Sequence, residues 1–274
     1  MLGAIGIKAK GKLQPALDRT ARLLVLLVML LPTAAGAQRL LDLPQETAFS
    51  SAEITAYAAR AYGARLHTLS AAAQLDTDPA LKARLQRLMP PLERAAAYEL
   101  PAAAAIDWEI HACSGCDENA SALPGGKLLV SADYIARLAL TDDELGYLLA
   151  HEIGHVLAQH TREFASAARY FVDNGRARGY ADIERELGEN FSVALRMRPF
   201  YAQQELEADR IGFVLGTHAG FTPSAMLGLL AKLDTHERPL INTHPDSEMR
   251  IAQARGMLDA MRRLAAQPLR QAPF

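Results

Sequence analysis

The pentapeptide at residues 151–155, His-Glu-Ile-Gly-His, lies within a run of apolar residues that has helical spacing. On an α-helix, side chains four positions apart share a face, so His151 and His155 can bind one metal ion. Glu152 then lies beside the water that such a metal binds, where a general base is needed. Chance alone places this pattern in roughly one chain in a hundred of this size, so it needs support from the rest of the sequence.

A pair of acidic residues on a separate predicted helix supplies that support. A catalytic zinc site usually takes three protein ligands and leaves a fourth position for water. Glu205 and Asp209 are four positions apart and therefore share a face. One of them can bind the metal while the other accepts a hydrogen bond from a ligand imidazole. Glu207 lies about 200° away from Glu205 around the helix and is expected to be solvated.

Three segments of the chain resemble a known family. Residues 205–209 match the Glu-x-x-Ala-Asp signature of the zinc metallopeptidases that include the CAAX prenyl proteases and HtpX. Residues 119–126 resemble that family's Asn-Ala-x-x-Leu-Pro-Gly-Gly stretch, which precedes its active-site edge strand. Thr243-His244-Pro245, followed by Arg250-Ile251, resembles its third block. The resemblance implies a mostly helical α+β, zincin-like fold, with a long active-site helix and a small β-sheet whose edge strand borders the cleft.

The resemblance also implies a metal centre and a reaction. One Zn²⁺ is expected to be bound by His151, His155 and Glu205, with Asp209 orienting a ligand histidine. Such a metal polarises the scissile carbonyl and lowers the pKa of its bound water towards neutrality. Glu152 is expected to accept the water's proton and pass it to the leaving amine.

The third block contributes two further candidates by resemblance. His244 or Arg250 is expected to donate a hydrogen bond to the tetrahedral oxyanion. His244 can instead fill the fourth coordination position, which would give a self-inhibited resting state. A histidine at a helix N-terminus without a catalytic task is the simpler alternative.

The segment after the Gly125-Gly126 turn is predicted to form an exposed edge strand. An extended polypeptide can pair with such an edge through main-chain hydrogen bonds, which do not depend on side-chain identity. This predicts cleavage of unfolded or misassembled polypeptides rather than of a narrow motif. The residues assigned to this edge are Gly126, Lys127, Leu128, Leu129 and Val130.

The chain has two cysteines, Cys113 and Cys116, in the sequence Cys-Ser-Gly-Cys. In an oxidising compartment a disulfide across this short turn is favoured. A thioredoxin-like redox pair needs a strand-to-helix turn, whereas the flanking residues here indicate a loop between strands. Half of a zinc knuckle is disfavoured because no second cysteine pair exists.

The N-terminus is typical of an export signal. A basic stretch precedes the apolar core Leu23–Leu31, and Ala35-Gly36-Ala37 is a small-x-small cleavage site. The apolar core is shorter than the roughly 20 residues of a membrane span. We therefore predict a signal peptide over residues 1–37 and a periplasmic protein, with an N-terminal anchor in the inner membrane as the alternative. Residues 38–100 are predicted to be an N-terminal helical segment, and residues 101–274 the metallopeptidase domain.

The charge of the chain argues against nucleic-acid binding. The whole chain carries 29 basic and 31 acidic side chains, and removing residues 1–37 takes away five basic residues and one acidic residue, which leaves a net charge of −6. Such a chain has no electrostatic reason to bind nucleic acid. Membrane contact, if any, is expected to be peripheral.

Capping signals and apolar periodicity predict helices over much of the chain. Asp78-Pro79 is expected to open a helix that runs to about Leu100. The capping box Thr141–Glu144 is expected to open the active-site helix, which should end at about His160. His160 lies nine residues beyond His151, about 180° round that helix, and should face away from the metal.

The sequence also predicts two strands and one further helix, from weaker patterns. Residues 105–113 and 127–131 have strand-like patterns, and the turn-rich residues 117–126 join them. A helix is expected over roughly residues 201–218. Residues 161–198 give no clear pattern.

Together these features favour an active zinc endopeptidase that cleaves unfolded or misassembled envelope proteins. A metal-stabilised chaperone without turnover is the alternative, but a pure binding protein has no need of a general base at Glu152. An exopeptidase is disfavoured, since no cluster of charged residues to bind a peptide terminus is apparent.

Overall fold

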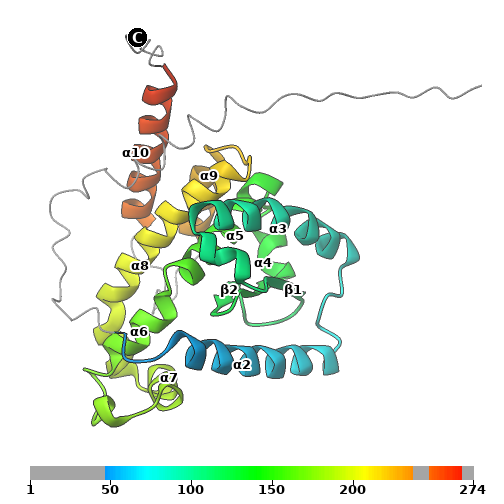
Figure 1. The fold of residues 1–274 in the computed structure, drawn as a ribbon. Helices are drawn as coiled ribbons and strands as arrows, with labels where there is room; N and C mark the ends of the chain where they lie inside the picture. Colours follow the sequence, from blue (N-terminus) through cyan, green and yellow to red (C-terminus); the bar gives the residue numbers. More distant parts are fainter. Residues whose placement is uncertain (1–46, 237–246, 267–274) are drawn as a thin grey trace, which may run out of the picture.

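The computed structural model describes residues 47–236 and 247–266, so the predicted signal peptide and His244 lie outside the described residues. The fold is mostly helical with one three-stranded sheet, and the predicted α+β class is confirmed. In Figure 1 the sheet lies between α2, in blue, and α3. The elements are α2 (Ser51–Ala71), α3 (Pro79–Glu99), η1 (Pro101–Ala105), β1 (Glu109–Cys113), β2 (Ala120–Leu123), β3 (Lys127–Ser131), α4 (Ala132–Arg137), α5 (Asp142–Leu157), α6 (His160–Ala168), η2 (Gly175–Ala177), α7 (Tyr180–Glu189), α8 (Phe191–His218), α9 (Ala225–His236) and α10 (Ser247–Ala266).

Helix α5 is the long active-site helix, and it begins at the predicted capping box. Thr141 Oγ1 accepts from Glu144 N, and a Glu144 carboxylate oxygen accepts from Thr141 N at 2.8 Å. The helix ends at Leu157, earlier than predicted, because Gln159 takes a left-handed conformation with a φ of 56°. The chain then turns, and His160 starts α6 instead of continuing α5.

Helix α8 is longer than predicted. It is opened by Asn190, whose side chain accepts from the backbone N–H groups of Ser192 and Val193, and it continues through Pro199. Residues 161–190, which gave no clear pattern, form α6, η2 and α7. These elements and the start of α8 enclose a second apolar core with α2, which contains Ile54, Phe164, Tyr180, Ile183 and Met197.

Helices α5 and α8 cross closely because small residues lie where they touch. A Cβ on Gly212 would lie 2.9 Å from His151 N, and one on Gly154 would lie 3.0 Å from Ala208 O. Both distances are too short for a side chain, so glycine allows the two backbones to approach. This approach brings the acidic residues of α8 next to the histidines of α5.

The sheet has the strand order β1–β3–β2, with β3 parallel to β1 and antiparallel to β2. Strand β3 is therefore central, and Leu128, Leu129 and Val130 are buried. The prediction that residues 126–130 form an exposed edge strand was wrong. The edge strand next to α5 is β2, which lies within the segment predicted to be a turn-rich connection.

The main core contains α3, α5, the sheet, the second half of α8, α9 and α10. Asp78 caps α3 with Pro79 at its first position, as predicted. None of the helices in the described ranges is both long enough and apolar enough to cross a membrane.

Candidate metal centre

Three side chains from two helices converge on one point. His151 Nε2 lies 3.0 Å from His155 Nε2. The carboxylate oxygens of Glu205 lie 3.3 Å from each of these nitrogens. A tetrahedral zinc ion bound at 2.0–2.1 Å separates its ligand atoms by about 3.3 Å. The donor set and its spacing therefore fit such an ion.

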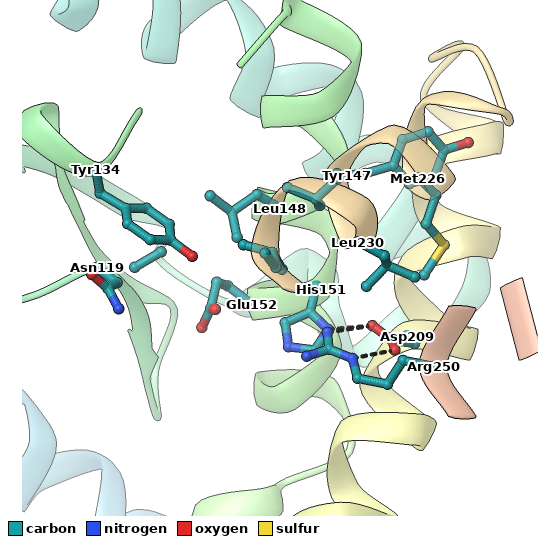
Figure 2. A pocket seen from close by; sticks show the side chains of 13 residues that line it. Asn119, Tyr134, Tyr147, Leu148, His151, Glu152, Asp209, Met226, Leu230 and Arg250 are labelled. Atoms are coloured by element: carbon teal, nitrogen blue, oxygen red, sulfur yellow. Dashed lines mark hydrogen bonds and ion pairs between the residues drawn. The ribbon is translucent and has the colours of Figure 1, made fainter. Parts of the chain in front are cut away.

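Asp209 and Arg250 fix the orientation of His151, as Figure 2 shows. His151 Nδ1 donates to Asp209 Oδ1 at 2.9 Å, which leaves the lone pair of Nε2 directed at the metal position. Asp209, only 1% exposed, also accepts from Arg250 Nε at 2.7 Å and Arg250 Nη2 at 2.8 Å. The spacing alone left open which acidic residue faces the metal, and the family resemblance assigned Glu205. In the structure Glu205 faces the metal position, and Asp209 lies behind His151.

The surrounding charges shift two pKa values in this network. Burial alone lowers the pKa of His151, but the carboxylates of Glu205 and Asp209 outweigh it and raise that pKa to about 10. Burial alone raises the pKa of Asp209, but Arg250 and His151 outweigh it and hold that pKa below its usual range. Asp209 is therefore ionised at neutral pH, and a metal cation that enters the site replaces a proton on His151.

Arg250 faces the two acidic residues of α8. Besides the two bonds to Asp209, its Nη1 lies 3.0 Å from Glu205 Oε2. Three guanidinium nitrogens are thus directed at the two carboxylates, and Arg250 is 5% exposed. These contacts hold Glu205 and Asp209 in place, and the expected contact of Arg250 with the oxyanion stays a prediction.

Glu152 is buried beside a small cavity. The cavity has a volume of about 20 Å³, enough for one water molecule, and its lining includes Glu152, His151, Asn119 and Tyr134. In Figure 2 the Tyr134 side chain, from α4, extends towards Glu152. Sequence reasoning missed Tyr134, which stands outside the recognised motifs. The position of Glu152 suits a general base that acts on a water at the metal.

A larger groove reaches the metal-ligand candidate His155. Its volume is about 490 Å³, and His155 lies in its wall. The groove runs between the end of α5, the N-terminal half of α2, η1 and the β2–β3 turn. Apolar side chains form much of its lining, including Ile54, Leu100, Ala103, Ile106, Ala122, Pro124 and Val156.

His160, expected to lie about 180° round the helix from His151, instead contacts His155 on the side away from the metal position. Its Nδ1 lies 2.8 Å from His155 Nδ1, and its side chain is buried. The predicted continuation of the active-site helix to His160 was wrong, because Gln159 ends α5 and redirects the chain.

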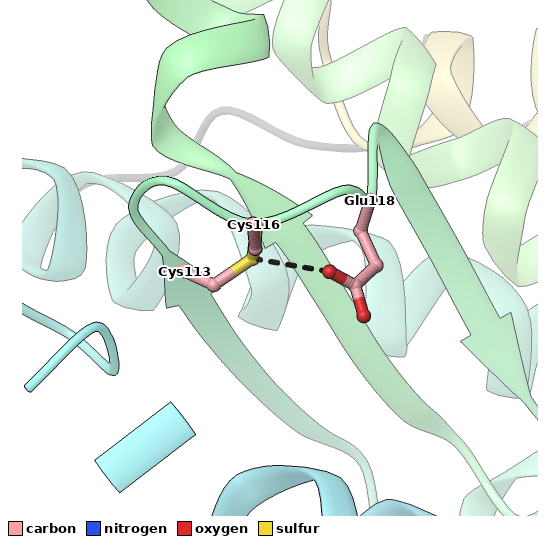
Figure 3. A group of neighbouring side chains, drawn as sticks. All are labelled: Cys113, Cys116 and Glu118. Carbon is pink, nitrogen blue, oxygen red and sulfur yellow. Dashed lines mark hydrogen bonds between the residues drawn. A yellow bond between two sulfur atoms is a disulfide. The ribbon is translucent and has the colours of Figure 1, made fainter. Parts of the chain in front are cut away.

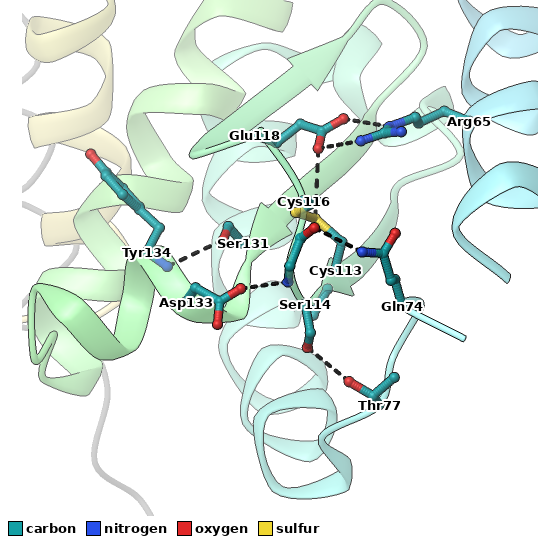
Figure 4. The surroundings of a disulfide bond; sticks show 12 residues. Arg65, Gln74, Thr77, Cys113, Ser114, Cys116, Glu118, Ser131, Asp133 and Tyr134 are labelled. Atoms are coloured by element: carbon teal, nitrogen blue, oxygen red, sulfur yellow. Dashed lines mark hydrogen bonds and ion pairs between the residues drawn. A yellow bond between two sulfur atoms is a disulfide. The ribbon is translucent and has the colours of Figure 1, made fainter. Parts of the chain in front are cut away.

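Cys113 and Cys116 are joined by a disulfide with an S–S distance of 1.99 Å. Glu118 lies beside them (Figure 3), but both sulfurs are in the disulfide and neither is a thiolate that could bind a metal. Arg65 binds the Glu118 carboxylate through two nitrogens, one at 2.6 Å. Gly115 O accepts a hydrogen bond from Gln74, and Gly115 N donates one to Asp133. Figure 4 shows Gln74 and Asp133 beside the disulfide. The turn is therefore a structural link between β1 and β2.

Removing this disulfide should lower stability with little effect on the metal centre. The disulfide joins residues only three positions apart, and the chain-entropy model gives about 2 kcal/mol for so short a loop. We expect the Cys113→Ala/Cys116→Ala variant to lose up to that free energy of unfolding in urea titrations. Dithiothreitol should shift the wild type similarly. An unchanged urea midpoint would show that the disulfide contributes nothing.

Comparison with known proteins identifies the family. The model of Peptidase family M48 matches residues 77–258, and the chain belongs to this family. It is 34% identical to the mitochondrial metalloendopeptidase OMA1 of Schizosaccharomyces pombe over 53% of this chain and 45% of that protein. It is 30% identical to the beta-barrel assembly-enhancing protease of Escherichia coli K12 over 54% of this chain and 34% of that protein. The chain thus spans less than half the length of these relatives.

These comparisons confirm one prediction and overturn another. The predicted metallopeptidase family is confirmed by the match over the segment that holds both metal-ligand motifs. The predicted periplasmic location was wrong, because matched relatives from two yeasts, Arabidopsis thaliana and cattle are mitochondrial OMA1 proteins.

Proposed function

We propose that this chain is a zinc-dependent endopeptidase. The observation that carries the proposal is the spacing of the His151, His155 and Glu205 ligand atoms, with Glu152 next along the same helix. These three ligand atoms leave a fourth coordination position for water, which is the arrangement of catalytic zinc sites.

Each residue has a task in the proposed reaction. When bound, the metal supplies polarisation of the scissile carbonyl and acidification of a water. Glu152 accepts the proton of that water and transfers it to the leaving amine. Asp209 and Arg250 keep His151 and Glu205 in orientation. His244, outside the described residues, remains our proposed donor to the oxyanion or inhibitory fourth ligand.

We propose that the substrate is an unfolded or misassembled polypeptide that pairs with β2. In antiparallel strands, alternate residues direct their backbone groups towards the partner strand. Asn119 O accepts from Ser131 N, so Ser121 also faces β3, while Ala120 and Ala122 face away. No described strand covers that side of β2, and the groove begins at Ala122. The name of the Escherichia coli relative, an assembly-enhancing protease, agrees with this substrate class.

Replacing Ala122 by proline tests this edge. The variant loses an outward N–H and keeps the ladder to β3, so the fold and zinc content should be retained. One lost hydrogen bond, worth about 0.5–1.5 kcal/mol, should lower kcat/KM for casein by about threefold to tenfold. Ser121→Pro is the matched control, because it removes an inward N–H and should instead destabilise the sheet. Unchanged kcat/KM in the Ala122 variant would rule out pairing at this edge.

Digestion of casein tests the activity. The chain is expected to cut internal bonds, which separates an endopeptidase from an exopeptidase when the products are sequenced by mass spectrometry. Removing the metal with 1,10-phenanthroline should abolish cleavage, and stoichiometric Zn²⁺ should restore it. Zinc binding without cleavage would favour the alternative, a metal-stabilised chaperone.

We also propose a peptidase unit larger than the residues 101–274 assigned from the sequence. Helix α3 shares the core of α5 and the second half of α8, which supports its inclusion. Of the residues 38–100 assigned to an N-terminal segment, α2 then remains as an element that covers the sheet and the groove.

A further inference from the structure

His160 lies on the side of His155 that faces away from the metal position. His155 and His160 belong to separate helices, and the left-handed Gln159 brings them together. Their rings meet edge to face, with centroids 4.8 Å apart, and their Nδ1 atoms are 2.8 Å apart. His160 is 3% exposed. The contact is thus short and partly buried, and it joins two side chains that no sequence motif connects.

The direction of this hydrogen bond follows from the metal position. His155 Nε2 faces His151 Nε2 and Glu205, so it must present a lone pair to a metal. A neutral imidazole carries its proton on the other nitrogen, so His155 Nδ1 is the donor. His160 Nδ1 must then be the acceptor, and His160 carries its own proton on Nε2.

Two contacts hold His160 in this role. Gln204 Nε2 donates to the backbone carbonyl of His160 at 3.0 Å, which fixes the start of α6 against α8. Glu207 Oε2 lies 3.5 Å from His160 Nε2, close enough for an ion-pair contact but too long for a good hydrogen bond. Nε2 has no closer partner among the described residues. The carboxylate thus lies on the side where the proton of His160 is expected.

We propose that His160 is a positioning residue for the metal centre. It accepts the Nδ1–H of His155 and so holds Nε2 towards the metal, as Asp209 does for His151. The inference rests on the proposed zinc site. It assigns the two ligand histidines different partners, a carboxylate for His151 and a neutral imidazole for His155. Hydrogen-bond partners of this kind typically change metal affinity by about 10–100-fold.

Three substitutions at His160 distinguish a role as hydrogen-bond acceptor from a role in packing alone. His160→Asn places an amide oxygen where Nδ1 was and should keep the hydrogen bond. His160→Gln places its amide near the Nε2 position, and His160→Leu has no acceptor. We expect the Gln and Leu variants to bind Zn²⁺ about 10–100-fold more weakly in competition with a chromophoric chelator. The Asn variant should bind close to wild type and give the wild-type Co²⁺ absorption spectrum.

His218→Leu is the matched control. Its histidine is half-buried, contacts Glu99 on α3 and lies at the end of α8. Its loss should therefore lower stability without weakening zinc binding. The proposal is overturned if His160→Leu binds zinc as tightly as wild type. It is also overturned if a folded His160→Asn binds as weakly as His160→Leu. Should the leucine variant fail to fold, the Asn and Gln pair decides. A wild-type chain that binds no zinc would instead refute the proposed function.

Discussion

Replacing Glu152 by glutamine is expected to reduce casein cleavage by about 10²–10⁴-fold, the usual contribution of a positioned general base. Glutamine retains the shape of the side chain but cannot accept the proton of a metal-bound water. Because the three converging ligand atoms come from other residues, zinc content should stay near one ion per chain. The two measurements, cleavage rate and bound zinc, are made on the same purified samples.

The controls for this substitution are chosen by position. Glu189→Gln changes an exposed carboxylate on α7 and should leave both quantities unaltered. His155→Ala should lose zinc and activity together. Wild-type turnover in Glu152→Gln would exclude this residue as the base. If wild type and variant both bind zinc and neither cleaves, the chaperone alternative gains support.

The metal centre was predictable because its information is local in the sequence. His151 and His155, and likewise Glu205 and Asp209, are four residues apart, and helical geometry alone places each pair on one face. The spacing does not predict that α5 and α8 cross at these residues. That depends on close backbone approach at Gly154 and Gly212, a tertiary feature.

The two wrong predictions about the fold concern the end of the active-site helix and the edge of the sheet. One depends on the conformation of a single residue, and the other on how the strands pair. Gln159 adopts a left-handed conformation that glycine usually takes, so nothing in the sequence marked the break before His160. The sheet edge was misplaced because the Gly125-Gly126 turn does not reveal which flanking strand is central. The unbroken apolar run of β3, Leu128-Leu129-Val130, is typical of a strand buried on both faces and could have indicated its place.

Arg250→Met is expected to cause the largest loss of stability among single substitutions near the site. In the metal-free chain Arg250 and the protonated His151 together face the carboxylates of Asp209 and Glu205, and all four side chains are buried, so removing Arg250 leaves one carboxylate in excess. Removing one partner of a buried ion pair typically costs about 3–5 kcal/mol, because a charge remains without compensation. Urea unfolding of the metal-free chain at neutral pH should show a loss of this size.

The pH dependence of that loss identifies its cause. Because the folded-state pKa of Asp209 lies below its ordinary value of 3.8, its ionisation stabilises the wild type above that pH. This stabilisation is lost as the pH falls through the folded pKa. The difference between wild type and Arg250→Met should therefore be full at neutral pH and shrink below about pH 4. Arg250→Lys keeps the charge but not the bidentate contact with Asp209. Its free energy of unfolding should therefore lie between those of wild type and Arg250→Met. A difference that is constant with pH would mean that Arg250 stabilises the fold by packing rather than by charge.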